Sequence, residues 1–224
     1  MSQKTALIIG ATGLVGRELM EYLLTSEYYD KVKAVVRRDL DKTHDRLEVI
    51  VIPDFDKLDD YKDQLHGNHV YCCLGTTMKQ AGSKKNFIKI DLEYPLRLAQ
   101  ITGQYPEFES FHLVTATGAN ADSPLFYNEV KGKVEEAIIA LGLKSLYIYR
   151  PSLLLGERKE FRLGEEIAKA ISAFISFFVI GSRRGRLWSI KGQDVAKTMY
   201  LEAQGSEPGT HILEPKHMVR LGRL

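Results

Sequence analysis

The chain has 224 residues, a length that holds one full α/β domain and excludes an enzyme with a large separate substrate domain. Its 31 Lys and Arg against 29 Asp and Glu give a net charge of +2, which argues against a nucleic-acid-binding protein, because phosphate backbones are bound by clustered cations. Hydrophobic residues at 44% and charged residues at 27% exclude a disordered or fibrous chain. We therefore expect a small-molecule partner and no nucleic acid.

The N-terminal segment MSQKTALIIGATG lacks the longer apolar region and cleavage site of a secretory signal, which predicts a cytoplasmic protein. The two cysteines, Cys72 and Cys73, are adjacent in an apolar run and indicate neither a disulfide framework nor a zinc site. The six histidines lack metal-ligand spacing, so we expect no metal. The longest apolar stretch, residues 167–180, contains Lys169 and is shorter than the roughly 18 to 20 residues of a membrane span.

Short β-branched runs alternate with longer amphipathic runs along the chain, which is typical of a parallel sheet with crossover helices. Strands are expected at residues 5–9, 33–36, 48–52, 68–74, 110–115 and 145–149. Helices are expected at residues 14–25, 84–102, 129–141 and 165–180, and from about residue 194. The pattern predicts a doubly wound parallel α/β fold in a single domain, residues 1–224. Residues 151–224 are expected to cover the substrate side of the sheet rather than to extend it.

A glycine-rich turn, GATGLVG at residues 10–16, joins the first expected strand to the first expected helix. Gly10 permits a tight turn, Gly13 lets the backbone approach a pyrophosphate, and Gly16 lets the helix pack closely on the sheet. The helix N-terminus then offers N–H donors and the positive end of its dipole. The spacing differs from the standard GxGxxG, and a turn that serves packing alone is the alternative. The strand-turn-helix context favours a dinucleotide site of the Rossmann fold.

Two arginines, Arg37 and Arg38, stand at the end of the second expected strand, 21 and 22 residues after Gly16. A cofactor with free ribose hydroxyls calls for an acidic residue at this place. A guanidinium instead suits a 2′-phosphate, because its forked donors match the phosphate oxygens. The sequence therefore predicts NADP(H) in preference to NAD(H), with a solvated pair at a strand end as the alternative.

Tyr127 and Lys131 have the YxxxK spacing, which places a phenol and an ammonium one helical turn apart. We expect the cation to lower the pKa of the phenol, so that Tyr127 can donate a proton to a carbonyl under reduction. The spacing alone is weak, but here it opens the helix after the fifth strand. A hydroxyl in the preceding VTATGA turn would hold the carbonyl oxygen, and spacing does not decide between Thr115 and Thr117.

Several segments together resemble the atypical short-chain dehydrogenases/reductases, and more narrowly their Tat-interacting-protein-like branch of NADPH-binding reductases. These segments are GATGLVG, VVRR, CLGTT followed by AGS, VTATGA, FYNEVKGKVEEA and YRPSLLLGER. The resemblance extends from about residue 5 to about residue 160, with a weaker match at residues 193–197. It implies Thr115, Tyr127 and Lys131 as catalytic residues. The family generally has serine where this chain has Thr115, and the added methyl group narrows the pocket.

The resemblance also implies how NADPH is held. Asp54 and Phe55 would lie by the adenine, residues 74–76 along the ribose and diphosphate, Lys131 on the nicotinamide ribose, and Pro151 beside the nicotinamide. The full set of implied cofactor contacts is Gly10, Thr12, Gly13, Leu14, Val15, Gly16, Arg37, Arg38, Asp54, Phe55, Leu74, Gly75, Thr76, Lys131 and Pro151.

Two functions fit this sequence. The first is an NADPH-binding reductase of the short-chain dehydrogenase/reductase type that acts on a carbonyl of a small, apolar molecule. The second is an NADPH-dependent regulatory or interaction protein with slow or absent catalysis, because the eukaryotic relatives are known for partner binding. The wide apolar stripe of residues 165–180 fits burial, an apolar pocket or a partner surface, and the chain is expected to be a monomer or a homodimer. Arg183, Arg184 and Arg186 fit a solvated loop or an acidic substrate group.

Overall fold

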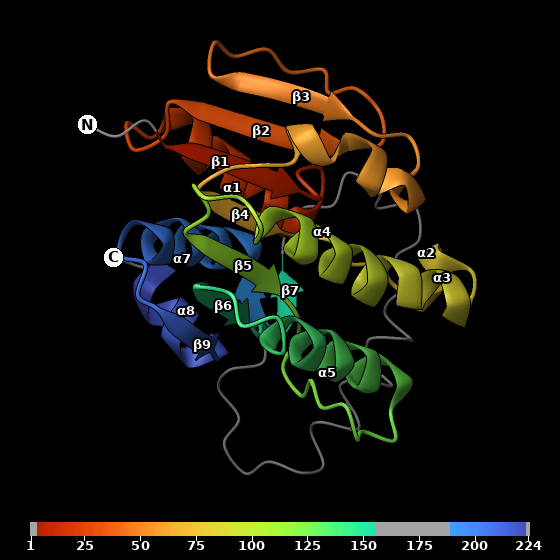
Figure 1. Ribbon diagram of the computed structural model, residues 1–224. Helices are drawn as coiled ribbons and strands as arrows, with labels where there is room; N and C mark the ends of the chain where they lie inside the picture. Colours follow the sequence, from red (N-terminus) through yellow and green to blue (C-terminus); the bar gives the residue numbers. More distant parts are fainter. Residues whose placement is uncertain (1–3, 156–188, 223–224) are drawn as a thin grey trace.

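The computed structural model describes residues 4–155 and 189–222 (Figure 1). Seven parallel strands form one sheet in the order β3-β2-β1-β4-β5-β6-β9. The strands are β1 (Thr5–Ile9), β2 (Lys31–Val36), β3 (Leu47–Val51), β4 (His69–Cys72), β5 (Ser110–Val114), β6 (Ser145–Tyr149) and β9 (Gly209–Leu213). Strand order reverses direction between β1 and β4, which confirms the doubly wound α/β fold.

Helices cover both faces of the sheet. On one face α1 (Leu14–Thr25) packs against α7 (Gly192–Gln204), and α8 (Pro215–Gly222) packs against α7. The other face carries the 3₁₀ segment η1 (Phe55–Gln64), α4 (Tyr94–Thr102) and α5 (Phe126–Ile139). Shorter elements are α2 (Met78–Ala81), α3 (Lys84–Ile88), the π-helical segment η2 (Lys89–Glu93) and the paired strands β7 (Leu153–Leu155) and β8 (Ser189–Lys191). Among the described helices none is long and apolar enough to cross a membrane.

Strand β1 is apolar on both faces because helices cover both faces of the sheet there. In β1, Ala6 and Ile8 enter the core under α1 and α7, and Leu7 and Ile9 enter the core under α4 and α5. All four side chains are fully buried. This explains why the strand appears in the sequence as a continuous apolar run rather than an alternating one.

Strands β1 and β6 and helix α1 have the predicted bounds, and other predicted elements within the described residues differ by a few residues. The single helix expected at 84–102 is wrong, because the chain forms α3, the π-helical segment η2 and then α4. Pro95 lies in the first turn of α4, where its missing N–H costs no hydrogen bond, although its ring disfavours an uninterrupted α-helix. The widened turn at η2 carries the buried Asp91.

The last third of the described chain departs from the expectation that it only covers the sheet. Strand β9 pairs in parallel with β6, from Ser145 opposite Gly209 to Tyr149 opposite Leu213, and so extends the sheet by one strand. It was missed because it is short and mostly exposed, so its sequence, GTHIL, has no clear apolar pattern. The helix expected at 165–180 and Arg183, Arg184 and Arg186 lie outside the described residues.

Four aromatic side chains form a row across the sheet that we call the tyrosine–histidine row: Tyr71 on β4, His112 on β5, Tyr147 on β6 and His211 on β9. Each residue is directly opposite the next in register. Successive ring centroids are 4.8, 4.9 and 4.6 Å apart, and all three pairs are stacked. Burial lowers the pKa of His112 well below its ordinary value, so its ring is neutral. At its centre the row therefore places a polar aromatic ring in the core without placing charge there.

Candidate dinucleotide and proton-transfer site

The glycine-rich turn has the geometry that only glycine allows. Gly10 has φ +82°, and a Cβ atom on it would lie 2.6 Å from the carbonyl carbon of Cys73. A Cβ atom on Gly16 would lie 2.2 Å from the carbonyl oxygen of Gly10. Gly13 is the N-cap of α1, where no side chain caps the helix and no acidic residue occupies the first turn. The N-terminal N–H groups of α1 therefore suit a phosphate, and the residues present fit a dinucleotide.

The turn lies at the position in the sheet where the strand order changes direction. Residues 10–16 follow β1, and Leu74, Gly75 and Thr76 follow the neighbouring strand β4. The backbone N–H of Cys73 donates a 2.9 Å hydrogen bond to the carbonyl oxygen of Ile9, which fixes one loop against the other. In doubly wound sheets, ligands bind in the crevice outside the carboxyl ends of the strands at such a point.

The expected adenosine contacts lie at the ends of β2 and β3. Arg37 and Arg38 directly follow β2, are exposed, and form no ion pair with any other described residue. Asp54 is the N-cap of η1, and its Oδ1 accepts a 3.0 Å hydrogen bond from the N–H of Asp56. Phe55 is buried, with its ring edge-on to Tyr94. The two guanidinium groups are thus available to an anionic ligand at this edge.

A buried ion pair lies under the loop after β4. Nζ of Lys131 is 2.7 Å from Oδ1 of Asp91, and the two side chains are 5% and 0% exposed. The other carboxylate oxygen of Asp91 accepts a 3.0 Å hydrogen bond from the N–H of Thr76. A Cβ atom on Gly75 would lie 3.7 Å from Asp91 Oδ1 and 3.9 Å from Lys131 Nζ, so the loop passes directly over the pair. Burial opposes the charge on Lys131, but Asp91 and Tyr127 outweigh it and raise its pKa.

Asp91 was not among the residues predicted from the sequence. Its signal was present, because an acidic residue occurs in an otherwise helical run at a position that faces the core. A buried carboxylate requires a cation or several donors, and Lys131 and Thr76 supply both.

Tyr127 lies on α5 one turn before Lys131, with its ring 5.8 Å from that of Phe87. Burial raises the pKa of Tyr127, Lys131 opposes this effect, and Asp91 adds to it. The expectation of a lowered pKa is therefore wrong, because desolvation of the phenolate outweighs the attraction of the cation. The phenol is protonated at neutral pH, the state required of a proton donor.

The geometry counts against Thr115 as the group that holds a substrate carbonyl. Thr115 is buried, and its hydroxyl donates a 2.6 Å hydrogen bond to Oε1 of Glu135. Glu135 in turn pairs with Arg150, which also reaches Glu214 at 3.4 Å. These four residues, Thr115, Glu135, Arg150 and Glu214, form what we call the Arg150 network.

Thr117 is nearer the surface and is half-buried. Its hydroxyl donates a 2.9 Å hydrogen bond to the carbonyl oxygen of Arg150, and its N–H donates to the carbonyl oxygen of Pro151. The turns after β5 and β6 are therefore bound to each other at the carboxyl edge of the sheet, and the buried Pro151 lies at this junction.

The seven-stranded parallel sheet, the glycine turn at its switch point and the lysine beside a tyrosine define a dinucleotide-binding protein of the Rossmann class. Residues 6–135 match the model of the NAD dependent epimerase/dehydratase family, and the chain belongs to this family.

Curated relatives agree with the family assignment. The protein HTATIP2 of Rattus norvegicus is 34% identical over 173 residues, which are 75% of this chain and 70% of that protein. The mitochondrial protein FMP52 of Candida glabrata is 34% identical over 209 residues, 93% of this chain and 83% of that protein. The mitochondrial protein FMP52-1 of Scheffersomyces stipitis is 31% identical and covers 97% of this chain and 98% of its own. The resemblance to the Tat-interacting-protein-like branch is thereby confirmed.

Solved structures share the fold. MoeE5 in complex with UDP-glucose and NAD has a TM-score of 0.68 at 19% identity, covering 94% of this chain and 75% of its own. The enzyme WbmH of Bordetella bronchiseptica in complex with NAD+ has a TM-score of 0.66 at 16% identity, covering 93% of this chain and 75% of its own. The structure of gox2181 has a TM-score of 0.68 at 16% identity, covering 98% and 97%.

The comparisons overturn one expectation from the sequence. The N-terminal segment predicted a cytoplasmic protein, whereas the fungal relatives from Candida glabrata, Candida albicans and Debaryomyces hansenii are named as mitochondrial proteins. The absence of a secretory signal separates secreted from non-secreted proteins and does not distinguish compartments within the cell.

Proposed function

We propose that the chain is an NADP(H)-dependent oxidoreductase that reduces the carbonyl group of a small molecule. The observation that carries the proposal is the buried pair of Lys131 and Asp91, one helical turn from Tyr127 and directly under the loop that follows β4. Buried ion pairs that serve only to stabilise a fold are rare, because both charges lose their hydration in the core. At the ligand-binding edge of a Rossmann sheet, a charged lysine beside a phenol has a chemical use.

In this proposal a reduced nicotinamide, when bound, supplies the hydride that the carbonyl carbon accepts. The Tyr127 hydroxyl gives its proton to the carbonyl oxygen, and the phenolate that results is stabilised by the Lys131 ammonium. Asp91 keeps Lys131 charged and fixes its position. Of the two threonines, we propose Thr117 rather than Thr115 as the hydroxyl beside the substrate, because the Thr115 hydroxyl is occupied by Glu135.

Replacing Tyr127 by Phe tests the proton donor. The variant should bind NADPH as the wild type does and reduce carbonyl substrates at least 100-fold more slowly, because the phenyl ring keeps the packing and loses the proton. The measurement is NADPH oxidation with a panel of aldehydes and ketones, with Tyr61→Phe on η1 as the control. Unchanged turnover in Tyr127→Phe would refute the assignment.

Cofactor preference is tested on Arg37 and Arg38. We expect NADPH to bind at least tenfold more tightly than NADH, and the double variant Arg37→Gln/Arg38→Gln to remove this preference while leaving NADH binding unchanged. Dissociation constants from calorimetry measure it, with Arg97→Gln on α4 as the control. Equal binding of the two cofactors by the wild type would contradict the proposal.

The second candidate is an NADPH-dependent regulatory or interaction protein with little or no catalysis. It is favoured by the Thr115 hydroxyl, which is buried and already donates to Glu135. NADPH at 100 times its dissociation constant would then stabilise the fold by about 2.7 kcal/mol, and no carbonyl compound in a broad panel would be reduced. Turnover of any compound in that panel would decide for the oxidoreductase.

A further inference from the structure

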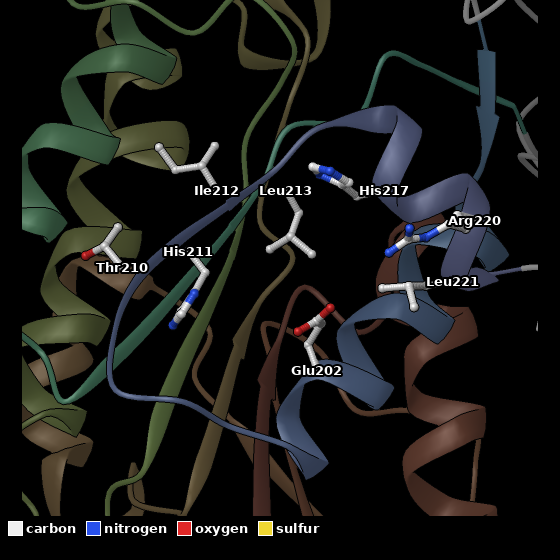
Figure 2. Close-up of a pocket in the computed structure, with 8 residues that line it drawn as sticks. All are labelled: Glu202, Thr210, His211, Ile212, Leu213, His217, Arg220 and Leu221. Atoms are coloured by element: carbon white, nitrogen blue, oxygen red, sulfur yellow. The ribbon is translucent and has the colours of Figure 1, made fainter.

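A cleft of about 440 Å³ lies between α7, β9 and α8 (Figure 2). Strand β9 is the last in the sheet and is separated from β4 by β5 and β6, so the cleft is not part of the dinucleotide site. Its polar lining includes Glu202 from α7, His211 from β9, and His217 and Arg220 from α8. Leu213 and Leu221 contribute apolar surface. Charged and apolar groups thus share one small space.

The two opposite charges in this cleft have no direct bonding partner among the described residues. Neither Glu202 nor Arg220 forms an ion pair or a side-chain hydrogen bond with any residue in the described part of the chain. Figure 2 shows the Glu202 carboxylate and the Arg220 guanidinium directed toward the same space between α7 and α8. Burial raises the pKa of Glu202, and Glu207 adds to this effect, while His211 and His217 oppose it. A partly desolvated carboxylate without a donor is costly unless something else supplies one.

The polar groups of the cleft narrow the choice of ligand. Nε2 of His211 donates a 3.1 Å hydrogen bond to the carbonyl oxygen of Glu207, so this nitrogen is already used within the chain. The Glu202 carboxylate has only acceptors and favours a donor group in the cleft. Arg220 has only donors and favours an acceptor such as a carboxylate. A ligand with only a negative charge would place that charge beside the Glu202 carboxylate. A ligand with only a positive charge would place that charge beside the Arg220 guanidinium.

We propose that this cleft binds a small zwitterion of the α-amino-acid type, with its ammonium group on Glu202, its carboxylate on Arg220 and an apolar side chain against Leu213 and Leu221. A ligand with both charges pairs both side chains at once. The cleft volume falls within the range of small-molecule sites. This inference does not depend on the proposed reaction.

Calorimetry on the full chain with three related probes tests the proposal. L-Leucine carries both charges, L-leucinamide only the ammonium, and N-acetyl-L-leucine only the carboxylate. L-Leucine should bind, and each of the other two should bind at least tenfold more weakly, because each leaves one protein charge without a partner. Binding of N-acetyl-L-leucine or L-leucinamide as tight as that of L-leucine would overturn the proposal, and so would the absence of any binding of L-leucine.

Substitutions assign the binding to this cleft. Glu202→Gln and Arg220→Gln should each weaken L-leucine binding at least tenfold. The matched controls, Glu136→Gln on α5 and Lys216→Gln on α8, remove exposed charges outside the cleft and should leave it unchanged. Melting temperatures without ligand establish that each variant is folded, and if Glu202→Gln does not fold, Arg220→Gln alone decides. L-Leucine binding that survives the loss of the Arg220 charge would refute the site.

Discussion

Two buried clusters in this protein contain tyrosine beside titratable groups, and they are built in opposite ways. In the site, Tyr127 lies near the ionised pair of Lys131 and Asp91. In the tyrosine–histidine row, Tyr71 and His112 stack on each other in the centre of the sheet, and burial raises the pKa of Tyr71 and lowers that of His112, so neither is charged. The buried members of the row satisfy their polar atoms by hydrogen bonds, such as the 2.9 Å bond between His112 Nδ1 and the Tyr149 hydroxyl.

The difference separates a cluster that supports the fold from one that can do chemistry. A neutral network lowers the cost of burying polar atoms and gives no group a reason to change its protonation state. An ionised pair retains a cation beside a phenol at an additional desolvation cost. Substitutions in the two clusters should therefore have different consequences, both in size and in kind.

The largest effect on stability is expected at Asp91. Asp91→Asn leaves the buried Lys131 ammonium without a counter-charge and should lower the free energy of unfolding by about 3 to 5 kcal/mol. Urea unfolding at pH 7 measures this, with the exposed Asp122→Asn as the control. The double variant Asp91→Asn/Lys131→Met should recover most of the loss, because no charge remains buried. A change below about 1 kcal/mol in Asp91→Asn would show that Lys131 does not depend on this partner.

The pH dependence of stability should be governed in part by His69, whose ring lies edge-on to that of His112 in the row. His69, whose Nδ1 is 2.6 Å from the Tyr29 hydroxyl, is fully buried, and burial lowers its pKa to about 4 while Glu109 opposes the shift. In the unfolded chain His69 has its ordinary pKa of about 6.5 and binds a proton below that pH, whereas in the folded chain it stays neutral down to about pH 4. The folded state is therefore most stable, as far as His69 is concerned, above pH 6.5, and it loses this stability as the pH falls toward 4.

The expected loss from His69 over this range is about 3 kcal/mol. Urea unfolding at pH 7, 5.5 and 4.5 measures it, and His69→Asn should flatten the curve between these values. His44→Asn, which removes an exposed histidine, should leave the curve unchanged. An unaltered curve in His69→Asn would mean that His69 is protonated in the folded state.

The smallest effect on stability is expected from removing one hydroxyl of the row. Tyr71→Phe loses the 2.6 Å hydrogen bond to the Tyr29 hydroxyl, and that hydroxyl keeps its hydrogen bond to His69. The free energy of unfolding should therefore fall by only about 1 kcal/mol. It should leave NADPH binding and any turnover unchanged, whereas Tyr127→Phe should reduce turnover. A loss of turnover in Tyr71→Phe equal to that in Tyr127→Phe would remove the distinction between the two clusters.

Much of the first half of the fold can be predicted from the pattern of apolar residues and glycines in the sequence. Residues 5–25 were predicted with their bounds because a buried strand, three glycines and an amphipathic helix are strong local signals. Glycines 10 and 16 were predicted for their backbone roles, and the contacts that a Cβ atom would make bear this out. Strand β9 was missed because an exposed edge strand has little apolar pattern to detect.

Side-chain partners were harder to predict than elements. Asp91 was missed because its partner, Lys131, is 40 residues away, and only the packing of η2 against α5 brings the two together. The role of the Thr115 hydroxyl depends on its hydrogen bond to Glu135 on α5, which is 20 residues further along the chain. The row was missed because each of its four strands contributes one aromatic residue, and only the register aligns them.

The parallel pairing of β9 with β6 has a consequence for synthesis on the ribosome. Strand β6 ends at Tyr149, and its last partner strand begins at Gly209. At the usual elongation rates of about 5 to 20 residues per second, β6 remains an open sheet edge for roughly 3 to 12 seconds. During that interval the Tyr147 hydroxyl also lacks its 2.7 Å bond from the N–H of Glu207. The nascent chain is therefore most vulnerable to mispairing and chaperone capture after most of its sheet has formed.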